Sequence, residues 1–198
     1  LWHTARSITD AVIVEIPCRD MHGQEPPRLV ADMLKKCDVY IMPTSRSLTH
    51  TRARIEASQC GARGATMPGI TLDSMTRSLN ADYERIAAVT TELAGLVTRA
   101  RRARLITGHN SVLELDLSGR QCHLDTGMVR KRGEFSNLPA GEAYIAPQET
   151  WTHGTITVDG SFAPLGALSK RVTLTIRHGK LVDVQGNDKL EALFKRYT

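Results

Sequence analysis

A change in hydrophobic period near residue 100 constrains the fold more than any other feature of this sequence. Before it, short apolar runs alternate with helical patterns, which predicts a parallel sheet with right-handed crossovers. After it, Leu113, Leu115 and Leu117 alternate with acidic residues, as in a half-buried antiparallel strand. We therefore predict an α/β chain with a three-layer, Rossmann-like α/β unit at 1–100 and a mainly antiparallel, β-rich α+β unit at 101–198.

Individual elements follow from the same patterns. Nearly continuous apolar runs predict strands at 11–16, 39–42 and 62–67, the first rich in β-branched residues. The clearest helical stripe predicts a long helix over 81–100, and a short helix is expected at 188–197. Residues 11–67 are therefore predicted to form a β-α-β-α-β series.

Composition excludes several classes of protein. The formal charge is +5, but the arginine cluster at 99–104 comes with few aromatic residues, so we interpret it as a solvated helix end and expect no nucleic-acid partner. No apolar run reaches the roughly 18 residues of a membrane-spanning helix. The four cysteines include no Cys-x-x-Cys pair, which favours reduced thiols in a cytoplasmic protein without a membrane partner.

The segment Pro43–Arg52 is the first candidate site, because it holds five hydroxyl groups besides His50 and two arginines just beyond a predicted strand. Ligands of open α/β sheets collect at the carboxyl ends of strands, and helix N-termini favour anionic groups. The alternative is a Ser/Thr-rich helix cap with His50 facing solvent. The two interpretations are evenly matched.

Two further places carry polar residues that the fold does not require. His123 and Asp125 lie two apart and could share a face of a strand, but two metal ligands are too few, and a surface pair is the favoured interpretation. Glu142 follows a Gly/Pro-rich loop, where a rigidly held carboxylate suits a metal ligand or a general base. A charged strand residue is an equally good account of Glu142.

Three stretches, in this order and spacing, resemble the aminopeptidase T family of metallo-aminopeptidases. They are Thr44–Arg54, Ala65–Ile70 and Asn137–Pro147, and the last, with its Asn-Leu-Pro-Ala-Gly-Glu sequence, is the most specific. The segments His22–Pro27 and Asp159–Ser161 fit as well. The resemblance extends through nearly the whole chain.

This resemblance implies a cytoplasmic, homodimeric exopeptidase that releases N-terminal residues from peptide substrates. Two divalent ions (zinc, cobalt or manganese) would activate a water molecule, with Glu142 as a bridging ligand. We expect His50 to be catalytic and Ser45, Ser47 and Arg52 to bind the substrate. The family's other metal ligands have no counterpart in this sequence, so the chain looks like an internal fragment that is inactive by itself.

Two alternatives remain open. Dihydroxypyridine dioxygenases resemble the same framework and use one ferrous ion to open an aromatic ring. In that case His50 would act as an acid/base on the substrate. A third hypothesis is a non-catalytic dimerisation or folding module.

Overall fold

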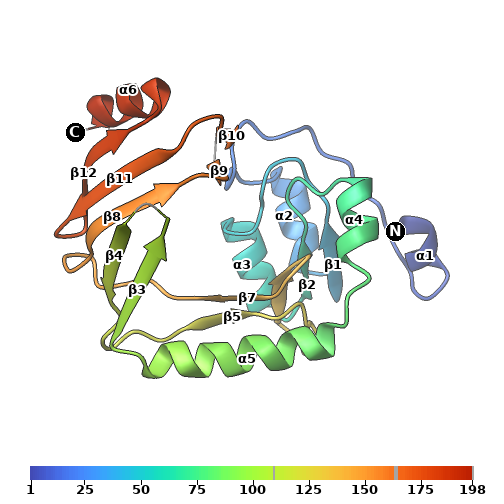
Figure 1. The fold of residues 1–198 in the computed structure, drawn as a ribbon. Coiled ribbons are helices and arrows are strands. Elements are labelled where there is room, and N and C mark those ends of the chain that lie inside the picture. The colour runs from blue at the N-terminus through green and yellow to red at the C-terminus, as the bar shows by residue number, and fades with distance from the viewer. Residues whose placement is uncertain (109, 163–164, 198) are drawn as a thin grey trace. The chain divides into compact units, whose positions relative to one another are not determined.

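The computed structural model describes residues 1–108, 110–162 and 165–197. The chain divides into two compact units (Figure 1). The first contains residues 1–91 and 125–142, and the second contains residues 92–124 and the described residues from 143 onward. The segment 125–142 therefore joins the first unit although it lies well beyond the expected boundary at residue 100, because one of its strands completes the parallel sheet.

The first unit is a small parallel sheet with helices. Its elements are α1 (Trp2–Arg6), α2 (Arg28–Leu34), β1 (Val39–Met42), α3 (Arg52–Gln59), β2 (Arg63–Thr66), α4 (Leu72–Ser78), the start of α5 (Tyr83–Arg99) and β6 (Phe135–Asn137). The strand order is β1-β2-β6, and both pairings are parallel. The prediction of a parallel sheet before an antiparallel one is confirmed.

The core of this unit lies on one face of β1. Tyr40 and Met42 point inward and pack with Leu48 and Ala57, whereas the alternating residues Val39 and Ile41 are about half exposed. This alternation follows from the period of two along a strand.

A glycine allows β1 and β2 to approach each other closely at this core. Gly64 lies opposite Tyr40 in the register, and a Cβ at this position would come within 2.1 Å of the Tyr40 carbonyl oxygen. Since carbon atoms pack at roughly 3.5–4 Å, any larger residue would push the two strands apart.

Both ends of α3 are capped by residues of the adjoining sequence. The Thr51 Oγ1 atom accepts a hydrogen bond from the Arg54 amide at 3.3 Å, as an N-cap does. Gly61 has a φ of 95°, and the Ala62 amide donates back to the Ala57 carbonyl at 3.0 Å. This is the Schellman arrangement that the glycine predicts. The helix that positions the hydroxyl-rich segment is therefore defined by its own sequence.

The predicted strand at 11–16 is wrong. No regular element forms there, and Val12 and Ile13 are 77% and 67% exposed. A β-branched run becomes a strand only where a neighbouring strand accepts its hydrogen bonds, and no strand pairs with this segment. The third place in the sheet belongs to β6, which is only three residues long.

The second unit is built on an antiparallel sheet with the strand order β12-β11-β8-β4-β3. Its elements are β3 (Arg102–Thr107), β4 (Ser111–Asp116), β8 (His153–Val158), β9 (Ser161–Phe162), β10 (Gly166–Ala167), β11 (Val172–Arg177), β12 (Lys180–Gln185) and α6 (Asp188–Tyr197). Two short strands, β5 (His123–Asp125) and β7 (Glu142–Tyr144), pair where the chain passes between the units. None of the helices in the described residues combines the length and the apolar character needed to cross a membrane.

Candidate functional site

The hydroxyl-rich segment (residues 44–52) connects β1 to α3 at the carboxyl edge of the parallel sheet. Within it, Thr49 and Thr51 are 4% and 1% exposed, but His50 between them is exposed. The Thr51 hydroxyl donates to the Leu48 carbonyl at 2.7 Å, which closes the turn. The exposed His50 side chain is therefore flanked in sequence by two buried residues, Thr49 and Thr51, whose positions are fixed by hydrogen bonds.

A cluster of three polar side chains holds this segment from the inside. The Asn137 Oδ1 atom lies 2.7 Å from the Thr66 hydroxyl and 3.1 Å from the Thr49 hydroxyl, and the two hydroxyl oxygens are 2.8 Å apart. Thr66 and Asn137 are register partners at the ends of β2 and β6. We call these three residues the threonine–asparagine cluster. It joins both strand ends to the residue that precedes His50.

The loop before α2 holds the same segment from the outside. The Ser47 amide donates to His22 Nδ1 at 3.0 Å, and the Gly23 amide donates to the Ser47 carbonyl at 2.8 Å. The Glu25 carboxylate accepts from the Arg52 and Ala53 amides at 2.6 and 3.1 Å. A carboxylate at a helix N-terminus pairs with unsatisfied N–H groups and with the positive end of the helix dipole.

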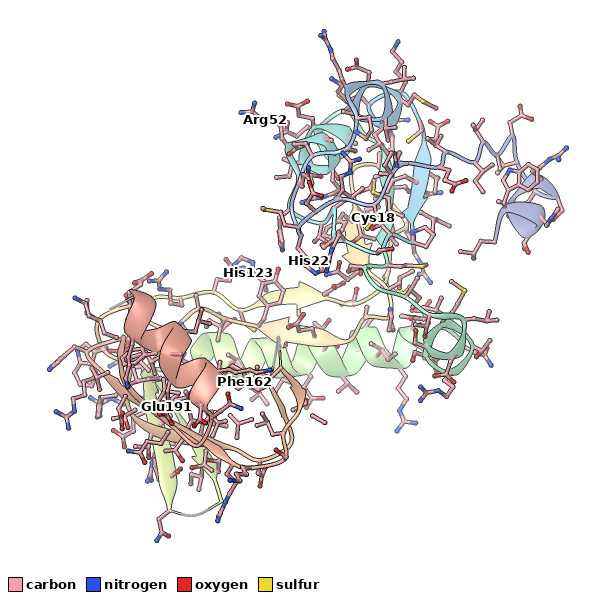
Figure 2. The ribbon with its side chains drawn as sticks, turned by 90° about the horizontal axis from the view of Figure 1, so that it is seen from above. Cys18, His22, Arg52, His123, Phe162 and Glu191 are labelled. Atoms are coloured by element: carbon pink, nitrogen blue, oxygen red, sulfur yellow. The ribbon has the colours of Figure 1, made fainter. Side chains whose placement is uncertain are left out.

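Two arginines near this segment behave differently. Arg54 donates from Nε to the Thr49 carbonyl at 2.7 Å, and its guanidinium lies 4.2 Å from the centre of the Phe135 ring. Burial lowers the pKa of Arg54, because desolvation disfavours its charged form. Arg52, the expected substrate ligand, has an 84% exposed side chain, with its Nε 3.9 Å from Glu56. Figure 2 shows Arg52 and His22 at separate places on the first unit.

The two serines predicted to bind substrate also differ. Ser45 is exposed, whereas the Ser47 hydroxyl oxygen accepts a hydrogen bond from the Thr49 amide at 3.2 Å. Ser47 therefore takes part in the turn that carries His50. The structure brings Ser47 and His50 into one turn and leaves Ser45 on its outer surface.

His123 and Asp125 take separate roles and do not form the surface pair that was favoured, because His123 is exposed and Asp125 is buried. The His123 ring stacks on Tyr144, with ring centres 5.5 Å apart. Asp125 is buried, and its carboxylate accepts hydrogen bonds from the Ser136 hydroxyl and, at 3.1 Å, from the Asn137 amide. Because both oxygens of Asp125 have protein partners, this carboxylate supports β6.

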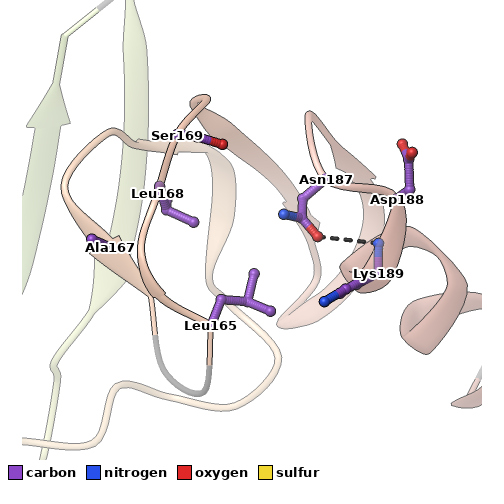
Figure 3. Close-up of a pocket in the computed structure, with 7 residues that line it drawn as sticks. All are labelled: Leu165, Ala167, Leu168, Ser169, Asn187, Asp188 and Lys189. Carbon is purple, nitrogen blue, oxygen red and sulfur yellow. Dashed lines mark hydrogen bonds between the residues drawn. The ribbon is translucent and has the colours of Figure 1, made fainter.

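The structure also has cavities away from this segment, and the following are examples. One, of about 480 Å³, lies in the first unit between the start of α5 and Ala140–Gly141. Another, of about 310 Å³, lies in the second unit between Leu165–Ser169 and the start of α6 (Figure 3). There the Asn187 Oδ1 atom accepts from the Lys189 amide at 3.1 Å, so its side chain caps α6. Neither cavity is lined by a residue of the hydroxyl-rich segment.

Comparison with known proteins identifies the family. The family model NicX, 2,5-dihydroxypyridine 5,6-dioxygenase, matches residues 17–198. The chain belongs to this dioxygenase family. No curated protein matches the chain.

Two solved structures share the fold of this dioxygenase-family chain. The 2,5-dihydroxypyridine dioxygenase from Pseudomonas putida KT2440 aligns over 92% of this chain and 53% of its own, with a TM-score of 0.72 and 17% identity. Wild-type AmpT from Thermus thermophilus aligns over 86% of this chain and 55% of its own, with a TM-score of 0.54 and 16% identity. The chain therefore spans about half the length of both proteins, and at these identities the likeness establishes the fold.

The aminopeptidase prediction is wrong. The framework resemblance exists, as the similarity to AmpT shows, but the family model is that of the dioxygenases, and the dioxygenase structure superposes better. The assignments as a hydrolase, a metallopeptidase and a protein acting in proteolysis are withdrawn with it. Membership of an enzyme family, the coarser expectation, is confirmed.

A metal site is not formed by the described residues of this dioxygenase-family chain. Within 1–108, 110–162 and 165–197, no three His, Cys, Asp or Glu side chains gather closely enough to hold an ion. Glu142, the expected bridging ligand, is exposed at the first position of β7. The ligands present therefore fit neither a two-metal centre nor a single iron.

Sequence reasoning missed the anchors of the site. Arg54, Glu25 and Asn137 lie in stretches that carry the family resemblance, yet no local pattern gave them a role. Glu25 contacts residues 27 and 28 positions away, and Asn137 contacts Thr49 across 88 positions. Contacts at such separations depend on strand order and register, which periodicity alone does not define.

Proposed function

We propose that this chain forms the substrate-positioning part of a ring-cleaving dioxygenase that acts on 2,5-dihydroxypyridine. The observation that carries the proposal is the family match over residues 17–198. The fold shared with the Pseudomonas putida dioxygenase supports it. As the chain spans about half of that enzyme, the activity is proposed for the protein to which these residues belong.

His50 is proposed as the acid/base. A dihydroxylated ring has acidic hydroxyl protons, and a group that accepts one raises the electron density of the ring. Histidine suits this task, because its unperturbed pKa lies close to neutral pH. The exposed His50 side chain on a hydrogen-bonded turn can meet a ligand without first having to order its own backbone.

Ser45, Ser47 and Arg52 are proposed as substrate contacts. The Ser47 oxygen is already an acceptor within the turn, so its hydroxyl hydrogen is the part that can reach a ring oxygen. Ser45 offers a second exposed hydroxyl group, and Arg52 offers a cation to a deprotonated ring oxygen.

The metal requires ligands beyond those described. A ferrous ion is the metal expected for a dioxygenase of this type, and it would supply the activation of oxygen. Because no ligand set gathers in the described residues, we propose that this set lies outside them. The bridging role of Glu142 came with the two-metal aminopeptidase and is not proposed again. Glu142 remains a candidate metal ligand or general base because of its position after a Gly/Pro-rich loop. A homodimer likewise remains a proposal, which light scattering tests.

The experiment is an anaerobic titration of the metal-free chain with 2,5-dihydroxypyridine, followed by absorbance or calorimetry. We expect saturable binding that is roughly 10-fold weaker for His50→Gln, the equivalent of about 1.4 kcal/mol for one lost hydrogen bond. His3→Gln is the matched control, because His3 is exposed on α1 and precedes the family match. Ferrous ion should leave this affinity unchanged. Absence of binding, or equal affinities for wild type and His50→Gln, refutes the proposal.

A further inference from the structure

We infer that Asn137 is a positioning residue that sets the placement of His50 through the Thr49 hydroxyl. The acid/base role of His50 rests on the proposed function, but the mechanical link between these residues does not. Asn137 belongs to the Asn-Leu-Pro-Ala-Gly-Glu stretch, for which a metal role was expected. The structure instead places its side chain against the segment that carries the imidazole.

The link begins with the positions of the two strand ends. β6 runs parallel to β2, and the register sets Asn137 beside Thr66 at the last position of each strand. Thr66 is fully buried, and Thr49 is 4% exposed. Both hydroxyl groups therefore need partners inside the protein, since buried polar groups without partners are costly.

Counting hydrogens shows why Asn137 is needed. Thr49 and Thr66 have one hydroxyl hydrogen each, but three oxygen–oxygen contacts connect these hydroxyls and Asn137 Oδ1. If the Thr66 hydroxyl donates to Asn137, the Thr49 hydroxyl can donate either to Asn137 or to Thr66. Without the Asn137 oxygen, one of the two buried hydroxyls loses its acceptor within the cluster.

The link then passes along the backbone to His50. Adjacent Cα atoms are about 3.8 Å apart, so a shift of Thr49 moves the start of His50 with it. The Thr49 carbonyl is held by Arg54, and the Thr49 amide by Ser47. These two hydrogen bonds limit movement of the Thr49 backbone. The hydrogen bond between the Thr49 hydroxyl and Asn137 fixes the position of the Thr49 side chain.

Asn137 is well suited to substitution because its own backbone is anchored independently of its side chain. Its amide donates to Asp125 at 3.1 Å, and the following Leu138 amide donates to the Thr66 carbonyl at 3.0 Å. Replacing the side chain by leucine, of similar size, leaves both bonds in place. We therefore expect Asn137→Leu to fold with β6 still paired to β2.

The experiment compares Asn137→Leu, Thr49→Val and the double variant by NMR. The readouts are the His50 ring Cε1–Hε1 signal through a pH titration, assigned by its loss in His50→Gln, and hydrogen exchange of the Thr51 amide. We expect each single variant to move the His50 signal and to speed Thr51 exchange by roughly 10-fold. The double variant should show no more change than either single one, because both changes break one link.

Two controls separate positioning from general destabilisation. Thr49→Ser retains the hydroxyl and should restore the wild-type His50 signal. Thr157→Val removes a buried hydroxyl in the second unit, where Thr157 contacts Ser111 at 2.5 Å, and should leave His50 unchanged.

The inference is overturned if Asn137→Leu lowers the thermal midpoint without moving the His50 signal, or if the two substitutions add. A failure of the proposed function would give a different experimental result from a failure of this inference. If the His50 signal responds as expected but wild-type protein does not bind 2,5-dihydroxypyridine, the link stands and the proposed substrate is wrong.

Discussion

Removal of the Glu25 carboxylate tests the outer anchor of the hydroxyl-rich segment. Glu25 accepts hydrogen bonds from the first two amides of α3, at 2.6 and 3.1 Å, where those amides have no partner within the helix. Loss of a helix-capping side chain costs about 1 kcal/mol, and loss of a charge at the helix N-terminus costs a further 0.3–1 kcal/mol or so. We therefore expect Glu25→Ala to destabilise the first unit by about 1.5 kcal/mol.

The assay is hydrogen exchange of the α3 amides together with thermal unfolding. For a chain of this size the loss corresponds to a midpoint roughly 3–6 °C lower, with faster exchange concentrated at the start of α3. Glu56→Gln is the matched control: it lies on the same helix, and its carboxylate has only ion pairs of 3.6–3.9 Å, so we expect a change below about 0.5 kcal/mol. Equal effects of the two substitutions would contradict the capping role of Glu25.

Two further predictions concern β2 and the loop before β6. Gly64→Ala should lower the thermal midpoint by several degrees, because the new Cβ meets the Tyr40 carbonyl at 2.1 Å; Gly160→Ala, with no atom within 4 Å, should not. The pKa of Glu134 is lowered by hydrogen bonds from the Lys131 and Arg130 amides. Its stabilising contribution is therefore complete above the ordinary glutamate pKa and lost as pH falls through the lower folded value. Urea melts at pH 7 and pH 3 should show Glu134→Gln less stable than wild type only at pH 7.

The elements that the sequence predicts well are those defined by neighbouring residues. β1 and β2 lie where the apolar runs predict strands, and the ends of α3 are likewise defined by neighbouring residues, Thr51 at the N-cap and Gly61 after the C-cap. The turn of the hairpin formed by β11 and β12 is also defined by adjacent residues, since His178 and Gly179 both have positive φ.

The elements that were missed depend on distant partners. The run at 11–16 has the composition of a strand but pairs with no other strand, whereas β6 has a three-residue sequence that no periodicity analysis detects. β6 exists because the Gly64 amide and the Leu138 amide connect it to β2 at either end. The same limit applies to the candidate site. The turn that carries His50 follows from local sequence, but the distant residues that hold this turn, Glu25 and Asn137, do not.

The three stretches that suggested an aminopeptidase meet in one place. Thr44–Arg54 contributes Thr49 to the threonine–asparagine cluster, Ala65–Ile70 contributes Thr66, and Asn137–Pro147 contributes Asn137. These residues serve to hold two strand ends and a turn together, a task that does not depend on the reaction performed. The solved structures of a dioxygenase and of AmpT are similar in fold to this chain.

A match at such anchors therefore identifies a scaffold and leaves the chemistry open. The two reactions differ in the side chains that contact the substrate and in the residues that bind the metal. In this chain His50 is the group that we propose to act on the substrate, and no ligand set gathers in the described residues. The stretch that most strongly suggested an aminopeptidase contributes Asn137 to contacts that support the fold of this chain. Because this fold is shared with both solved structures, it does not specify one reaction.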